Sequence, residues 1–367
     1  MARRLSRVRD WTLTALSWVP SERVPFPILL VLIAAPALYL LITPGGLFSP
    51  PGEVEEEVLA RSRVAGRGRV VKSSRSRRAP ASPEDPFHIA FGDMVEELER
   101  QARRHPARVA IYVKDLQRGW EWAYHADDLF PSASLIKAPI MAGVFEKINR
   151  GELSLNSKLK LRRRVRMGGS GTVKWHRDGT RFTVRRLLEK LIHESDNTAM
   201  LILIDEVGMG FLQQYFADTG LVYTEIYADG LRLTGGRVRY ENYTTAREMG
   251  LLFEKMYRGQ IVDEFASELM LDILKRRPTR SRLAKGLPVG WEIAHKTGLL
   301  RRACHDVGII FSPNGDYVVA VLTGRNRTYG SAKEFITRVG KITFKHYRSD
   351  PGFYVRAPGK SKPTRRK

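Results

Sequence analysis

Apolar and polar residues alternate with two different periods in the central part of the chain. The stretch FGDMVEELERQARRH (91–105) repeats apolar residues every three to four positions, which predicts an amphipathic helix. Two shorter stretches, RVAIYVKDL (108–116) and GWEWAYHADD (119–128), predict a strand, a turn and a second strand. A helical region is then expected from Ser134 to about Val207.

Strand patterns return toward the end of this region. GWEIAHKTG (290–298) and ACHDVGIIFSPNGDYVVAVLTG (303–324) predict further strands, and SAKEFITRVGKITFKHY (331–347) predicts a closing helix. Strands near both ends with helices between them indicate an α+β fold and not βαβ repeats. We therefore predict an antiparallel sheet flanked by helices, plus a helical subdomain, in one domain spanning residues 88–349.

An uncharged apolar segment precedes this domain. Residues 24–43 are twenty residues without a charge, about the length that crosses the hydrocarbon core as a helix. Arginines dominate the leader (1–23) and glutamates are the first charges after the segment, so the positive-inside rule predicts a cytoplasmic leader. The alternatives are a buried globular helix and a cleaved signal peptide, but the segment is long and no A-x-A site follows it. We expect one transmembrane signal anchor and a single-pass membrane protein whose catalytic domain is extracytoplasmic.

The remaining segments are polar and basic. Residues 44–87 are rich in Pro, Gly, Ser and Arg, which predicts a flexible linker, and residues 350–367 form a basic tail. The formal net charge is +23, of which +5 lies in residues 1–87, +5 in residues 350–367 and +13 between them. This spread argues against a single nucleic-acid surface, so no nucleic-acid partner is expected. An anionic lipid surface or an acidic envelope polymer accounts for the charge equally well.

Cysteine and histidine give no sign of a metal site. Cys304 is the single cysteine, which excludes an intrachain disulfide and a CxxC site. No H-E-x-x-H or similar spacing is present, and His193 and His295 are expected to pack near the motifs described next. The glycine-rich stretch 168–171 lacks the Lys-Ser/Thr of a phosphate loop. We therefore expect no metal and no cofactor.

Three short motifs carry the candidate chemistry. Ser134 and Lys137 form S-x-x-K at a helix start, where residues three apart share one face. Ser195-Asp196-Asn197 begins an apolar helical run, and Lys296-Thr297-Gly298 lies in an expected strand. Each motif is weak alone: the first fits a capped helix with a surface lysine, and the second fits a helix cap. Together, in this order, they are the set found in class A β-lactamases and penicillin-binding proteins.

The chain resembles the penicillin-recognising serine acyl-enzymes, and within them the class A β-lactamase branch. Beyond the three motifs, TVRRLLEKLIHESDNTAMLILIDEVG is similar to the helix–SDN–helix segment of that family. YTTAREMGLLFEKMYRG and AHKTGLLRRACHDVGIIF match later segments. The resemblance covers about residues 88–349 and implies a β-lactamase/transpeptidase-like fold.

The chemistry of the motif residues agrees with this resemblance. A serine hydroxyl needs a base to attack a carbonyl, and Lys137 can serve Ser134 when it is neutral. A nearby Lys296 favours that neutral form by disfavouring a second positive charge. Ser195 is expected to relay a proton to the leaving nitrogen.

The remaining motif residues are expected to bind substrate. Lys296 and Thr297 suit a substrate carboxylate, and Asn197 suits a substrate amide. By resemblance, the backbone N–H groups of Ser134 and Leu299, the residue after Gly298, would form the oxyanion hole.

One family feature is missing. Class A β-lactamases release the acyl group with a loop glutamate in an E-x-x-L-N arrangement, which residues 220–245 lack. Counting from either end of this interval places the expected glutamate at Asp229-Gly230. Asp229 is the first candidate for the deacylation base, with Glu225 and Glu241 as alternatives, and all three could be solvated loop carboxylates. Without this base, acylation is expected to be fast and hydrolysis slow.

The sequence therefore predicts a membrane-anchored serine hydrolase of the class A β-lactamase-like group. It would act through an acyl-enzyme on β-lactams or on D-alanyl peptides of the cell wall. The alternative is a penicillin-binding or sensing module that deacylates slowly and turns over little.

Overall fold

The computed structural model describes residues 85–231, 240–276 and 280–347. The predicted leader, anchor, most of the linker and the basic tail lie outside these residues. Among the described residues, no helix combines the length and apolarity needed to cross a bilayer.

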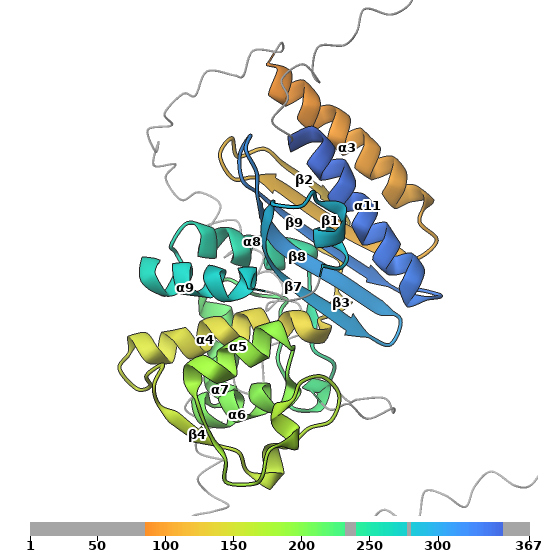
Figure 1. Ribbon diagram of the computed structural model, residues 1–367. Helices are drawn as coiled ribbons and strands as arrows, with labels where there is room; N and C mark the ends of the chain where they lie inside the picture. Colours follow the sequence, from red (N-terminus) through yellow and green to blue (C-terminus); the bar gives the residue numbers. More distant parts are fainter. Residues whose placement is uncertain (1–84, 232–239, 277–279, 348–367) are drawn as a thin grey trace, which may run out of the picture. The chain divides into compact units, whose positions relative to one another are not determined.

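A five-stranded antiparallel sheet lies at the centre of the described residues, in the order β2-β1-β9-β8-β7 (Figure 1). Its first strand pairs with its last in sequence, because β1 lies beside β9. The predicted antiparallel sheet built from both ends of the domain is therefore confirmed. The strands are β1 (Arg108–Asp115), β2 (Glu121–Tyr124), β7 (Glu292–Leu300), β8 (Ala303–Phe311) and β9 (Tyr317–Gly324).

Two long helices, one from each end of the domain, cover one face of the sheet (Figure 1). They are α3 (Pro86–Arg104) and α11 (Tyr329–Tyr347). Leu98 of α3 and Ile336 of α11 are buried against Val113 and Val319 of the sheet. Alternate residues of the same strands face the other side, so each strand is buried on both faces.

The other face carries the helices from the middle of the chain. Their shared core includes Ala142, Leu188, Leu203 and Met249, all fully buried. This arrangement confirms the α+β fold with a helical subdomain. The helices are α4 (Lys137–Asn149), α5 (Val184–His193), α6 (Asn197–Val207), α7 (Met209–Asp218), α8 (Ala246–Tyr257) and α9 (Glu264–Lys275), whereas the short α10 (Leu283–Gly286) packs on α11.

The region predicted to be helical from Ser134 to Val207 is interrupted. Between α4 and α5 the chain forms a two-stranded hairpin, β4 (Lys158–Lys160) with β5 (Arg181–Thr183). Arginine and glycine dominate residues 162–179, so no helical apolar stripe is available there. Short 3₁₀ turns, η2 (Arg163–Val165) and η3 (Val173–Trp175), replace it.

Candidate active site

Ser134 lies on a short 3₁₀ turn, η1 (Ala133–Ile136), that leads directly into α4. Before the turn, β3 (Phe130–Pro131) pairs with β6 (Tyr243–Thr244). Ala133 has a φ of 48°, a left-handed conformation that residues with a side chain rarely adopt. The sharp bend at Ala133 ends the strand and presents Ser134 at the start of the helix, as the motif predicts.

Lys137 is the first residue of α4 and is almost completely buried. Its Nζ lies 3.2 Å from Ser134 Oγ and 3.2 Å from Ser195 Oγ. It also lies 2.6 Å from the carbonyl oxygen of Ser195 and 2.7 Å from Asn197 Oδ1. Burial lowers the pKa of Lys137 to about 7, against the opposing attraction of the Asp196 carboxylate. A neutral amine is therefore accessible near neutral pH, within reach of both hydroxyl groups.

In the Ser195-Asp196-Asn197 motif, one residue caps a helix and the other two contact Lys137. Asp196 is the cap of α6, because its carboxylate accepts from Ala199 N at 2.9 Å and from Val173 N at 2.8 Å. Ser195 has a φ of 52°, and a left-handed residue with a side chain often marks a functional site. The side chains of Ser195 and Asn197 both contact Lys137. The motif is therefore a helix cap at Asp196 and part of the candidate site at Ser195 and Asn197.

The third motif approaches Ser195 from the sheet. Lys296 of β7 is fully buried, with Nζ 3.1 Å from Ser195 Oγ and 2.9 Å from the Thr297 carbonyl oxygen. A side chain at Gly298 would be tightly packed, because a Cβ there would lie 3.0 Å from His305 Cδ2 and 3.3 Å from Ala133 Cβ. Glycine at this position lets β7 lie close against the turn that carries Ser134.

A cavity of about 120 Å³ joins these elements. Four predicted site residues line it, namely Ser134, Lys137, Asn197 and Leu299. Ser195 and Lys296 adjoin it through the contacts described above. The three motifs, of which the first and the third are more than 150 positions apart in sequence, therefore meet around one serine.

The loop after α7 does not bring Asp229 into this cavity. Asp229 begins the turn η4 (Asp229–Leu231), but the lining residues from this loop are Gly230, Leu231 and Glu241. The role predicted for Asp229 stays a prediction, and Glu241 is the one carboxylate among the described residues that line the cavity. Glu225 is exposed and is likewise not in the lining.

Two residues that line the cavity around Ser134 were not predicted from the sequence as site residues. Gly169 and Ser170 lie in the irregular segment between β4 and β5, where the sequence indicated only a turn. Ser170 is held there because its carbonyl oxygen accepts from Asn197 N at 3.2 Å. Asn197 also donates from Nδ2 to the Gly168 carbonyl oxygen at 3.0 Å, so its amide group bridges Lys137 and this segment.

The histidines near the motifs make packing contacts. His193 bonds to the Ile273 carbonyl oxygen at 2.8 Å, and His295 is buried with Nδ1 2.8 Å from Asp306 Oδ1. Cys304 is buried in the sheet. Within residues 85–231, 240–276 and 280–347, no cluster of three or more His, Cys, Asp or Glu side chains is arranged to hold a metal ion.

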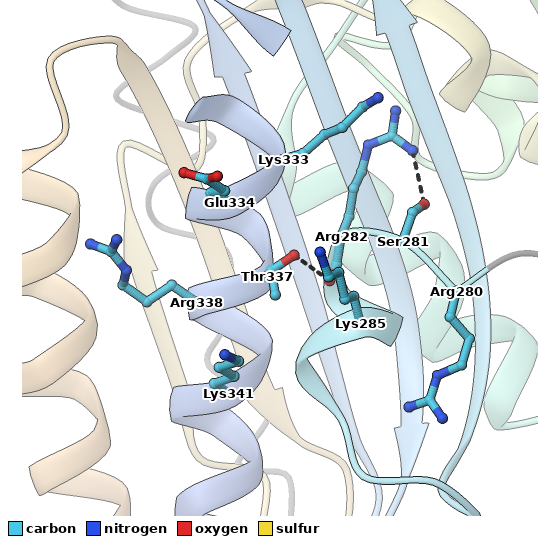
Figure 2. A pocket seen from close by; sticks show the side chains of 9 residues that line it. All are labelled: Arg280, Ser281, Arg282, Lys285, Lys333, Glu334, Thr337, Arg338 and Lys341. Carbon is cyan, nitrogen blue, oxygen red and sulfur yellow. Dashed lines mark hydrogen bonds between the residues drawn. The ribbon is translucent and has the colours of Figure 1, made fainter. Parts of the chain in front are cut away.

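A second cavity, of about 440 Å³, lies beside α10 and α11 and is basic (Figure 2). It differs from the first cavity because, among the described residues that line it, no serine hydroxyl lies within hydrogen-bond distance of a lysine amine. Arg282, on one side of it, is almost completely buried and donates from Nε to Cys304 Sγ at 3.2 Å. The charged lining residues are Arg280, Arg282, Lys285, Lys333, Glu334, Arg338 and Lys341.

Comparison with known proteins agrees with the site geometry. The family described as the Beta-lactamase enzyme family matches residues 93–347. β-Lactamase VEB-1 of Pseudomonas aeruginosa is 24% identical over 266 residues, covering 68% of this chain and 89% of that protein. A β-lactamase of Mycobacterium tuberculosis is 27% identical over 256 residues, covering 67% and 81% respectively.

Solved structures extend the match to the fold. The structure of PBP-A has a TM-score of 0.64 and 28% sequence identity, and covers 69% of this chain and 95% of its own. A variant of PBP-A solved as an acyl-enzyme complex with penicillin G has a TM-score of 0.65 at the same identity, covering 70% and 96%. Since the family match spans well over half of its residues, the chain belongs to the β-lactamase enzyme family and is a serine hydrolase of the β-lactamase type.

Proposed function

We propose that Ser134 is the nucleophile of a hydrolase that works through an acyl-enzyme. The observation that carries the proposal is the position of Lys137 Nζ, 3.2 Å from both Ser134 Oγ and Ser195 Oγ. In its neutral form Lys137 can accept the Ser134 proton as Oγ attacks the carbonyl carbon. The developing oxyanion would accept from the backbone N–H groups of Ser134 and Leu299.

Proton transfer to the leaving nitrogen is assigned to Ser195. Its Oγ lies between the amines of Lys137 and Lys296, at 3.2 and 3.1 Å, so a proton from Lys137 can reach the nitrogen through this hydroxyl. Lys296 and Thr297 would bind the substrate carboxylate. Asn197, which bridges Lys137 and the Gly168 carbonyl oxygen, would position Lys137 and line the substrate path.

The proposed substrates are β-lactams or D-alanyl peptides of the cell wall. Both present a carbonyl for acylation and a carboxylate for Lys296, so one site suits either. The penicillin G acyl-enzyme of the PBP-A variant supports β-lactams as acylating substrates. A slowly deacylating penicillin-binding module is the second candidate, because Gly230 occupies a position where the resemblance predicts a glutamate.

Membrane attachment completes the proposal. The support is the uncharged segment 24–43 with arginines before it and glutamates after it. The catalytic domain would then be extracytoplasmic, on the side where cell-wall peptides and β-lactams are found.

Labelling with benzylpenicillin tests the nucleophile and the acyl-enzyme together. Intact-mass analysis is expected to show one adduct on the wild-type protein and none on Ser134→Ala, since Ser195, the other hydroxyl beside Lys137, is assigned to proton transfer and not to attack. A burst of about one equivalent of product followed by a slow phase would favour the slowly deacylating candidate. An adduct that survives Ser134→Ala would contradict the assignment.

A further inference from the structure

The backbone just before Ser134 pairs with the end of the loop that leads into α8. In the pairing of β3 with β6, Phe130 lies opposite Thr244 and Pro131 opposite Tyr243. The pairing continues by one more bond, because Ser132 N donates to the Asn242 carbonyl oxygen at 2.6 Å. Glu241 directly precedes Asn242, the residue that bonds to the backbone just before the turn carrying the nucleophile.

Asn242 anchors this end of the loop. It is buried, and its Oδ1 accepts from Tyr227 N at 2.7 Å, while its carbonyl oxygen accepts from Ser132 as described. The backbone at Glu241 is therefore tied both to the turn carrying Ser134 and to the opposite limb of the loop. These bonds hold the backbone next to Glu241 at a fixed place relative to the turn that carries Ser134.

The position at which the resemblance predicts a glutamate cannot carry a side chain without rearrangement. A Cβ at Gly230 would lie 2.6 Å from Asn242 Cγ and 2.7 Å from Asn242 N. Distances below 3.0 Å are essentially never seen for real Cβ atoms. The buried Asn242 thus occupies the space that a side chain at residue 230 would need.

The Glu241 carboxylate has the environment of a base. It lines the cavity with Ser134 and Lys137, and its one hydrogen bond within the described part of the chain is from the neighbouring Asn242 N, at 2.9 Å. No Lys, Arg or His among the described residues lies within ion-pair distance of it. Burial raises the pKa of Glu241, with the bond from Asn242 N opposing the shift. A carboxylate of raised pKa without a cation is a stronger proton acceptor.

We propose that Glu241 is the general base that activates water to hydrolyse the acyl-enzyme on Ser134. The assignment rests on the proposed function. Glu241 accepts a proton from a water molecule as the water oxygen bonds to the acyl carbon. The tetrahedral intermediate then breaks its bond to Ser134 Oγ, which takes up that proton, and the product leaves as a carboxylic acid.

The test compares Glu241→Gln with the wild-type chain in the rates of acylation and of acyl-enzyme release. Stopped-flow and time-resolved intact mass give both rates with benzylpenicillin and with a D-alanyl thioester. Acylation is expected to change by less than about threefold, and release to slow by about 100-fold, the range of a lost general base. Glu241→Asp, which retains a carboxylate at shorter reach, is expected to fall between them.

Two matched carboxylates of the same loop serve as controls. Glu225→Gln and Asp229→Asn are expected to leave the release rate within about twofold of the wild type, and thermal unfolding of all variants verifies the fold. If Asp229→Asn slows release and Glu241→Gln does not, the assignment of Glu241 is wrong. Adduct formation on Ser134 with an unchanged release rate in Glu241→Gln overturns this assignment alone. Absence of any adduct with both substrates overturns the proposed function and this assignment with it.

A role in substrate recognition would give a different result. The Glu241 carboxylate could bind a substrate amine, so ampicillin, which carries an amino group, is compared with benzylpenicillin, which does not. If Glu241→Gln raises the KM for ampicillin alone and leaves the release rates of both acyl groups unchanged, Glu241 recognises the substrate and is not the base, which overturns the proposal. Slower release of both acyl groups supports it.

Discussion

A single buried lysine connects the motifs of this site. Lys137 contacts both serines and Asn197 with one nitrogen, and has no carboxylate within hydrogen-bond distance in the described residues. Desolvation disfavours the charged form of such a group, which is why its pKa falls to about 7. The lysine thus has the environment of a proton acceptor.

The rate of acylation should report this pKa. Only neutral Lys137 can accept the Ser134 proton, so the acylation rate constant is expected to rise about tenfold per pH unit below pH 7 and to level off above it. Stopped-flow measurement with benzylpenicillin between pH 5.5 and 9 gives the profile. Lys137→Arg, whose guanidinium stays protonated, is expected to abolish acylation at every pH. A flat wild-type profile from pH 5.5 to 8 would exclude Lys137 as the base.

Motif spacing predicted the site better than it predicted the loop. Ser134, Lys137, Ser195 and Lys296 are found from sequence because each motif begins or lies within a regular element whose neighbours are fixed. Glu241 appeared only as one of three loop carboxylates. Its place depends on the long-range pairing of β3 with β6, which leaves no periodic signal in the sequence.

At the scale of elements, the sheet and the two outer helices followed their apolar patterns closely. The predicted strand 108–116 is observed as β1, and the predicted helix 331–347 is the main part of α11. The prediction of a continuous helical region was wrong between α4 and α5, where arginines and glycines take the place of an apolar stripe. There the fold depends on contacts of Asp196 with the irregular segment, such as its bond from Val173 N, and local pattern does not encode these.

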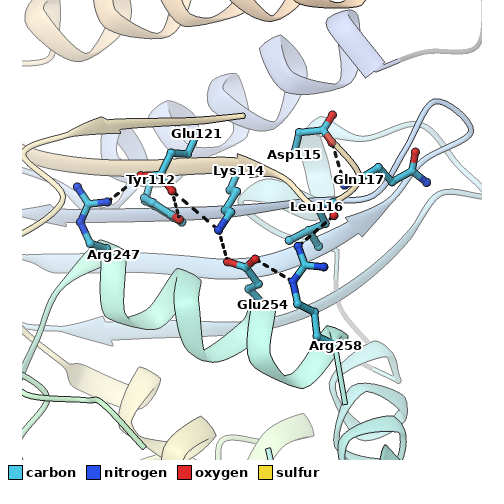
Figure 3. A network of polar contacts seen from close by, with 9 residues as sticks. All are labelled: Tyr112, Lys114, Asp115, Leu116, Gln117, Glu121, Arg247, Glu254 and Arg258. Carbon is cyan, nitrogen blue, oxygen red and sulfur yellow. Dashed lines mark hydrogen bonds and ion pairs between the residues drawn. The ribbon is translucent and has the colours of Figure 1, made fainter. Parts of the chain in front are cut away.

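Helix α8 is joined to the sheet by a cluster of ion pairs (Figure 3). Glu254 lies at its centre, with Oε2 2.7 Å from Lys114 Nζ on β1 and Oε1 2.9 Å from Arg258 Nε. Arg258 also donates to the Leu116 carbonyl oxygen at 3.1 Å. Although burial acts in the opposite direction, the bonds from Lys114 and Arg258 lower the pKa of Glu254.

Removing the Glu254 charge should therefore destabilise the domain. Glu254→Gln is expected to reduce the free energy of unfolding at pH 7 by about 2 kcal/mol, because Lys114, in a mostly buried position, loses the nearer of its two carboxylate partners and keeps only Glu121 at 3.9 Å. A lowered carboxyl pKa contributes stability above the ordinary value of 4.5 and loses it as the pH falls through the folded value. Urea unfolding at pH 7 and pH 3.5 should show the difference between variant and wild type shrinking in acid.

The exposed Glu268 on the nearby α9 provides a matched control. Glu268→Gln is expected to change the free energy of unfolding by less than about 0.5 kcal/mol at either pH. Equal losses for both variants would mean that the cluster around Glu254 contributes nothing specific.

At the scale of the whole domain, the basic cavity and the cavity that contains Ser134 lie at different places. The basic cavity adjoins α11, which covers one face of the sheet, whereas the Ser134 turn joins the helices on the other face (Figures 1 and 2). The cations around Lys285, Lys333 and Lys341 therefore lie apart from the cavity that contains Ser134. Under the proposed membrane attachment, this positive charge would favour contact with an anionic lipid surface or an acidic envelope polymer.

The membrane topology is the last prediction, and it depends on residues 24–43. Two aspartates in the middle of an uncharged twenty-residue segment oppose insertion by several kcal/mol, so Ile33→Asp with Leu38→Asp is expected to release the chain from the membrane fraction. In the wild type, protease added to spheroplasts is expected to digest the catalytic domain and spare a tag at the N-terminus, because the arginines of the leader stay in the cytoplasm. After detergent is added, the protease should digest both the catalytic domain and the N-terminal tag. Before detergent is added, a cytoplasmic marker protein must remain intact, which shows that the spheroplasts are sealed. A domain that resists protease until the membrane is dissolved would contradict the predicted orientation and, with it, the assignment of cell-wall substrates.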